Sequence, residues 1–151
     1  MKRINLFLLL ALPFLLSSCA TRPIGTWYVE SFEIVNTGLS QNSTKVRDIG
    51  TFTFRRNGRG EKNISYSLMG MPAKVDNMAF TWTANRRFVT MEGGGSEFSR
   101  SWIRIRNRWR YQKWKTTDGG NQVKVLELSK RKPKSDSNNN VSGGSRGTLN
   151  R

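Results

Sequence analysis

Apolar and polar residues alternate along most of this chain, and this pattern constrains the fold more than any other feature of the sequence. In residues 77–84, for example, Met78, Phe80 and Trp82 alternate with small or hydroxylated residues. Alternate side chains of a strand point to opposite faces of a sheet, so this spacing predicts a strand buried on one face. Because apolar residues almost never recur at the spacing of a helix, we expect an all-β domain. Comparable segments predict further strands at residues 26–35, 49–56, 61–68, 87–92, 96–106, 108–116 and 122–130.

Turn sequences separate the predicted strands and indicate how the strands connect. An Asn-Gly pair in residues 56–60 and an Asp-Gly pair in residues 117–121 are typical of tight hairpins, because these residues tolerate positive φ. Strands joined by short turns pair with their neighbours in sequence, and closing such a meander removes the exposed edges. The sequence therefore predicts an antiparallel meander of about eight strands closed into a small barrel. Short breaks fall at residues 84–86 and 93–95, and longer loops are expected at residues 36–48 and 69–75.

The first 19 residues have the order of a secretory leader that ends in a cysteine. Lys2 and Arg3 precede an apolar stretch, residues 4–16, which is too short to span a bilayer of roughly 30 Å. Residues 16–19, Leu-Ser-Ser-Cys, resemble the lipobox of bacterial lipoproteins. In that family the cysteine thiol receives a diacylglyceryl group, the leader is cut before the cysteine, and the new amine is acylated. An ordinary leader with a chance cysteine is the alternative.

The resemblance to bacterial lipoproteins implies a domain organisation and a location. It makes Cys19 the lipidation site, which acyl chains such as palmitate would hold on a membrane of the bacterial envelope. Ala20 is not the aspartate associated with inner-membrane retention, so an outer-membrane anchor is favoured if the cell has one. We expect a signal peptide at residues 1–18, a lipidated tether at 19–23, a barrel domain at 24–132 and a disordered polar tail at 133–151.

The composition argues against catalysis and against a metal site. The chain has no histidine and one cysteine, which lipidation would consume. This removes the usual general base near neutral pH and the commonest metal ligands. The acidic residues are scattered, without the clusters that indicate a paired acid and base or a calcium loop. We therefore expect no enzyme activity, no cofactor and no metal.

Three further segments resemble small bacterial lipocalin-like lipoproteins. Gly25-Thr26-Trp27 matches the family's GxW at the start of the first strand, residues 51–54 run into the Asn-Gly turn, and residues 125–131 fit the last strand. In the family, the tryptophan packs across the closed end of the barrel under a basic side chain from the last strand. The resemblance thus assigns barrel closure to Gly25, Trp27 and either Lys130 or Arg131, with a cation–π contact worth ~0.5 to 2 kcal/mol.

The aromatic content leaves two interpretations of the barrel interior open. After the leader the chain retains five Trp and three Tyr, and most of its eight Phe. These side chains could line a pocket for an acyl chain or another hydrophobic or amphipathic small molecule, or they could fill a small barrel. A cavity of about 300 Å³ or more would favour the carrier. The predicted wall residues are Phe52, Phe54, Tyr66, Met78, Phe80, Trp82, Ile103, Trp109 and Tyr111.

Basic and aromatic residues are interleaved in residues 100–115, within a chain of formal net charge +16. This pattern predicts a surface for anionic lipid head groups or cell-wall polymers, whereas an ordinary solvated barrel exterior is the alternative. Nucleic acid is a poor candidate partner in the envelope. Two functions follow: a membrane-anchored carrier, or a filled barrel that binds lipids, polymers or a protein partner through its surface. The predicted surface residues are Arg100, Arg104, Arg106, Arg108 and Arg110.

Overall fold

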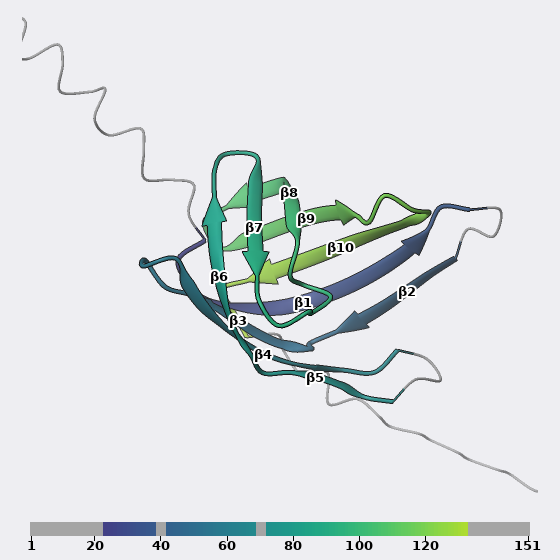
Figure 1. The fold of residues 1–151 in the computed structure, drawn as a ribbon, viewed down its shortest axis with the longest axis horizontal. Coiled ribbons are helices and arrows are strands. Elements are labelled where there is room, and N and C mark those ends of the chain that lie inside the picture. Colours follow the sequence, from purple (N-terminus) through teal and green to yellow (C-terminus); the bar gives the residue numbers. More distant parts are fainter. Residues whose placement is uncertain (1–22, 39–41, 69–71, 133–151) are drawn as a thin grey trace, which may run out of the picture.

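The computed structural model describes residues 23–38, 42–68 and 72–132 (Figure 1). The predicted signal peptide, Cys19, nearly all of the tether and the polar tail lie outside these residues. The described residues form strands and no helix. The strands are β1 (Gly25–Asn36), β2 (Asn42–Arg47), β3 (Gly50–Phe54), β4 (Arg59–Tyr66), β5 (Lys74–Asp76), β6 (Ala79–Ala84), β7 (Phe88–Glu92), β8 (Ser101–Arg108), β9 (Tyr111–Thr117) and β10 (Gln122–Ser129).

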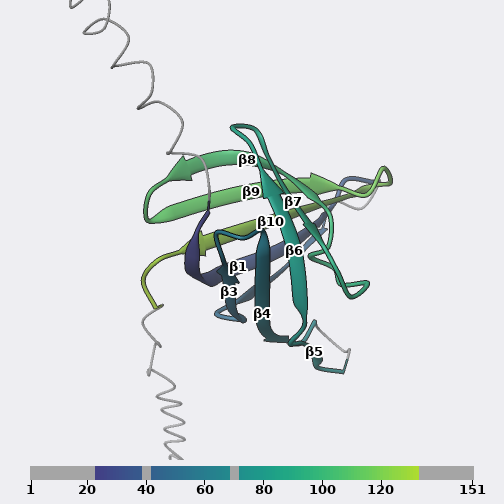
Figure 2. The same cartoon turned by 60° about the vertical axis from the view of Figure 1, so that its left-hand side comes forward.

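The strands form one antiparallel sheet that closes on itself. The order β10-β9-β8-β7-β6-β4-β3-β1 follows the chain, and β10 also pairs with β1, from Tyr28↔Ser129 to Asn36↔Gln122. Figures 1 and 2 show β1 and β10 side by side. Eight strands thus make the barrel, while β2 and β5 extend it at one end. This confirms the predicted fold class, an all-β meander closed into a small barrel.

One predicted loop contains a strand. Residues 36–48 were expected to form a polar loop, but β2 within them pairs with the second half of β1. Only Val46, paired with Phe32, contributes a large apolar side chain to this strand, so its alternation is weak in the sequence. Between β2 and β3 the chain bends at Asp48 (φ 54°) and Gly50 (φ 133°). A Cβ on Gly50 would lie 1.9 Å from the carbonyl oxygen of Asn63, so the bend requires glycine.

Two other boundaries differ from the sequence prediction. Residues 69–75 were expected to be loop, yet β5 begins at Lys74 and pairs with the end of β4. Residues 96–100 were expected to begin a strand, yet they form a loop that brings Phe98 into the interior, and β8 starts at Ser101. Gly93, Gly94 and Gly95 all have positive φ, a conformation that ends β7 and redirects the chain inward.

Candidate functional sites

Aromatic rings occupy the barrel interior. The ring centroid of Phe54 lies 5.3 Å from that of Phe80, 5.4 Å from that of Trp82 and 6.0 Å from that of Trp114. In each pair the edge of one ring faces the other ring. Phe52 joins this group through Phe54 and Phe80. Rings at these separations are in direct contact, so these side chains pack against one another across the barrel.

A residue from a loop closes one end of this aromatic core. Phe98 is 1% exposed, and its ring centroid lies 5.0 Å from Phe32, 5.3 Å from Phe52 and 6.0 Å from Tyr66. Its backbone carbonyl also accepts a hydrogen bond from Trp102 Nε1 at 3.0 Å. Loop 93–100 is therefore a plug, and its end of the barrel is called the plugged end below. Aromatic side chains therefore fill the barrel interior at the plugged end.

The structure divides the predicted pocket wall into inner and outer residues. Phe52, Phe54, Tyr66, Phe80 and Trp82 are buried in the core, as expected of wall or filling residues. The interior assignment of three others is wrong, because Met78, Ile103 and Trp109 are 51%, 45% and 79% exposed. Met78 precedes β6, Ile103 occupies an outward position of β8, and Trp109 lies at the tip of the β8–β9 hairpin. Tyr111 is half-buried on the outer side of β9, beside Glu127.

Two buried lysines point into the barrel near the plug. The side chain of Lys62 is 1% exposed, and its Nζ lies 3.1 Å from Asp76 Oδ1, without hydrogen-bond alignment. The side chain of Lys124 is 7% exposed, and its Nζ donates to Glu97 Oε2 at 2.5 Å. Both carboxylates come from outside the eight barrel strands. This cluster was not predicted from the sequence, although each lysine occupies an inward position of an alternating segment, beside Ile64 or Leu126.

The charges at the plugged end reinforce one another. The hydrogen bond from Lys124 holds the pKa of Glu97 below its usual value, and the nearby Arg100 and Lys74 act in the same direction. Burial, together with the charges of Glu97 and Asp76, raises the pKa of Tyr66 to about 12. Ser96 donates a hydrogen bond to Asp76 Oδ2, which ties the loop to β5. These contacts hold the plug in place.

Trp27 lies at the opposite end of the barrel, under a lysine. Lys130 Nζ is 4.2 Å from the centroid of the Trp27 ring and donates to the carbonyl oxygen of Ile24 at 2.9 Å. Trp27 Nε1 donates to the carbonyl oxygen of Pro23 at 2.8 Å. Gly25 has φ 96°, and a Cβ there would lie 2.7 Å from Lys130 Nζ. Of the two basic residues considered for this position, the structure places Lys130 over the indole and leaves Arg131 exposed.

Backbone hydrogen bonds tie the turns at the Trp27 end to neighbouring strands. Trp82 N in β6 donates to Gly58 O in the β3–β4 turn at 2.7 Å, and Arg104 N in β8 donates to Arg87 O in the β6–β7 turn at 2.8 Å. Lys130 N donates to Arg110 O at 3.0 Å, which links the β8–β9 hairpin to the end of β10. These turns carry exposed basic residues that we call the basic rim: Arg56, Arg59, Arg86, Arg87, Arg106, Arg108, Arg110, Arg131 and Lys132.

The predicted basic surface of residues 100–110 is not a single surface. Arg106, Arg108 and Arg110 are exposed and belong to the basic rim, but Arg100 lies at the plugged end, 3.4 Å from Glu97. Arg104 points inward, because it pairs with the inward-facing Trp114. A register shift between Arg104 and Arg106 then returns the following arginines to the outer face. The prediction that all five arginines share one face is therefore wrong.

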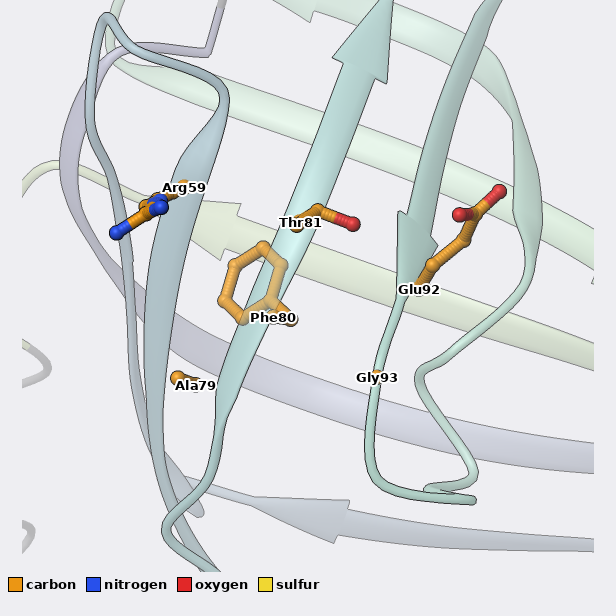
Figure 3. Close-up of a pocket in the computed structure, with 6 residues that line it drawn as sticks. All are labelled: Arg59, Ala79, Phe80, Thr81, Glu92 and Gly93. Atoms are coloured by element: carbon orange, nitrogen blue, oxygen red, sulfur yellow. The ribbon is translucent and has the colours of Figure 1, made fainter.

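The outer wall carries a shallow trough of about 530 Å³ over β4, β6 and β7. Its floor is formed by Ala79, Phe80 and Thr81, with Arg59 and Glu92 on either side (Figure 3). The two charged side chains extend in opposite directions, so they do not converge on a common ligand position (Figure 3).

Within the described residues, no group of three or more His, Cys, Asp or Glu side chains is arranged to hold a metal ion. In the same part of the chain, no helix has the length and apolar character needed to cross a membrane. No protein-family model, curated protein or solved structure matches this chain. The fold and the chemistry of its surfaces are therefore the basis for a functional proposal.

Proposed function

We propose that this protein is a lipid-anchored lipoprotein of the bacterial envelope that acts, without catalysis, through the outer surface of a filled barrel. The observation that carries the proposal is the packed aromatic interior, in which Phe98 occupies the position that a ligand would need. A barrel filled by its own side chains leaves its surface as the site of interaction.

The sequence supports the anchor and the class of partner. The lipobox-like residues 16–19 support lipidation at Cys19, and the exposed cations of the basic rim support an anionic partner. In the envelope the anionic partners are phosphate-bearing lipid head groups, anionic polymers and acidic surfaces of proteins.

The anchor is tested by replacing the proposed lipidated residue. We expect Cys19→Ser to move the protein from the membrane fraction to the soluble fraction after washing at high salt, because no acyl chain would then hold it. Metabolic labelling with a clickable palmitate analogue should mark the wild type and not the variant. A variant that still fractionates entirely with membranes after the wash would contradict the proposed anchor.

A second function is favoured by one specific observation, the pair of buried lysines beneath the plug. Glu97 and Phe98 together place a carboxylate on Lys124 and an apolar group in the aromatic core. A single-chain amphiphile with a carboxylate head has the same two chemical features. If loop 93–100 moved aside, such a molecule could replace both groups, and the barrel would act as a carrier.

Thermal unfolding with matched amphiphiles separates the two functions. A ligand that binds only the folded state stabilises it by about 2.7 kcal/mol at one hundred times its Kd. For a filled barrel we expect neither a fatty acid nor the fatty alcohol of equal length to raise Tm. For a carrier, the acid would raise Tm more than the alcohol, and Lys124→Met would abolish that preference, whereas the exposed Lys115→Met would retain it.

A further inference from the structure

We propose that the basic rim is the face of the barrel that lies on the membrane, where it binds anionic phospholipid head groups. This inference names the partner of the proposed surface function and rests on the lipid anchor for its geometry. Three observations support it: the concentration of unpaired cations at the rim, an exposed tryptophan within the rim, and the place where the N-terminal segment joins the barrel.

The first observation is that most of the exposed cations that form no ion pair with a described residue gather at the rim. Glu97 and Asp76 neutralise cations at the plugged end, Glu33 pairs with Lys45 of β2, and Glu127 pairs with Lys113 of β9. None of the basic-rim residues forms an ion pair with a described residue. Their neighbour Arg55 does, with Glu61 at 2.7 Å. The rim thus presents positive charge without local neutralisation, which attracts an anionic surface.

The second observation is an apolar tip within this positive surface. Trp109 is 79% exposed at the β8–β9 hairpin, with the guanidinium carbon of Arg110 5.2 Å from its ring centroid. Ile105, on the same hairpin, is 53% exposed. Tryptophan and arginine side by side are suited to the head-group region of a bilayer, where the indole is partly buried and the guanidinium meets phosphate.

The third observation is the position of the chain that leads to Cys19. Pro23 and Ile24 contact Trp27 and Lys130, so the N-terminal segment joins the barrel at the rim end. Figure 2 shows the start of β1 beside the β8–β9 hairpin. Four residue steps from Cys19 to Pro23 span at most about 14 Å when extended. A lipid on Cys19 would therefore hold the rim close to head groups and turn the plugged end away.

Tryptophan quenching measures this orientation in the lipidated full chain. Trp27, Trp82, Trp102 and Trp114 are buried, so lipid-borne quenchers report mainly on Trp109. We would reconstitute the chain in brominated phosphatidylcholine alone, or mixed with brominated phosphatidylglycerol. Because the anchor holds the protein on both vesicles, we expect at least about threefold more quenching on the anionic vesicles. The excess should disappear in Trp109→Phe and fall as salt shortens the Debye length from about 10 Å at 0.1 M to about 3 Å at 1 M.

Charge reversal supplies the matched control. Arg86→Glu with Arg108→Glu should reduce the excess quenching at least about fivefold, since each basic residue near an anionic surface contributes to the attraction. Arg47→Glu with Lys115→Glu makes the same change of charge at exposed, unpaired cations outside the rim and should reduce it less than about twofold.

Each adverse outcome has a distinct meaning. Equal quenching on neutral and anionic vesicles, or equal loss in both double variants, would overturn docking through the rim. Binding to a soluble anionic polymer with no excess quenching on vesicles would overturn it in favour of a polymer partner. If the wild-type chain fails to remain on either vesicle after flotation, the lipid anchor of the proposed function fails instead.

Discussion

At the scale of single residues, Arg104 opposes the stability of the fold. Its three guanidinium nitrogens each expose less than 1 Å² and have no hydrogen-bond partner among the described residues. Burial lowers the pKa of this guanidinium, because the charged form is poorly solvated there. A charge in this position costs stability that packing elsewhere must offset.

We therefore expect Arg104→Met to stabilise the protein by ~1 to 3 kcal/mol, since methionine keeps much of the side-chain length and removes the unpaired charge. Arg106→Met on the exposed face should change the free energy of unfolding by less than about 0.5 kcal/mol. Urea denaturation of both variants measures the difference. A loss of stability in Arg104→Met would show that the guanidinium has a favourable partner in solution.

At the scale of elements, the ion pair between Glu97 and Lys124 is one of the contacts that hold loop 93–100. Because Glu97 is a third exposed and Lys124 is buried, we expect Glu97→Gln to cost about 1 to 2 kcal/mol at neutral pH, less than for a fully buried pair. The pKa of Glu97 is lower in the folded chain than when unfolded, so its stabilisation is complete above the unfolded value of about 4.3. The stabilisation is lost as the pH falls through the folded pKa.

The measurement is the difference in unfolding free energy between the wild type and Glu97→Gln across pH. We expect the difference to be constant above about pH 5 and to shrink below about pH 4. Glu92→Gln serves as the control because Glu92 is exposed and forms no ion pair with a described residue. A difference that stays constant down to the lowest pH would show that the carboxylate of Glu97 does not hold the plug electrostatically.

The individual strands show which elements could be predicted from sequence patterns and which could not. β6 was predictable because Phe80 and Trp82 alternate with residues that face solvent. β2 was not, because it adds to one edge of β1 and buries little apolar surface of its own. Residues 96–100 have the alternation of a strand, yet the glycines before them turn the chain inward. Both a strand and a loop can direct a side chain into the core. A local sequence pattern does not distinguish these two cases.

At the scale of the whole molecule, charge is distributed along the barrel axis. Carboxylates neutralise the buried lysines at the plugged end, while the exposed cations of the basic rim have no such partners. Such a distribution orients a protein in the field of an anionic surface before contact. The residues of the basic rim come from turns that are far apart in the sequence. The net charge of the chain therefore predicts attraction to an anionic surface, but it does not predict which face of the barrel meets that surface.

The all-β class and the approximate positions of eight of the strands could be predicted from the residues alone, because alternation and turn residues act over a few neighbouring positions. The sequence also identified Trp27 and the residues beside it as candidates for barrel closure. The folded barrel was needed to show that Phe98 fills the interior, that Lys62 and Lys124 meet carboxylates, and that four separate basic segments lie at one end. These features depend on register and on closure between β1 and β10, where contacts join residues as much as 106 positions apart.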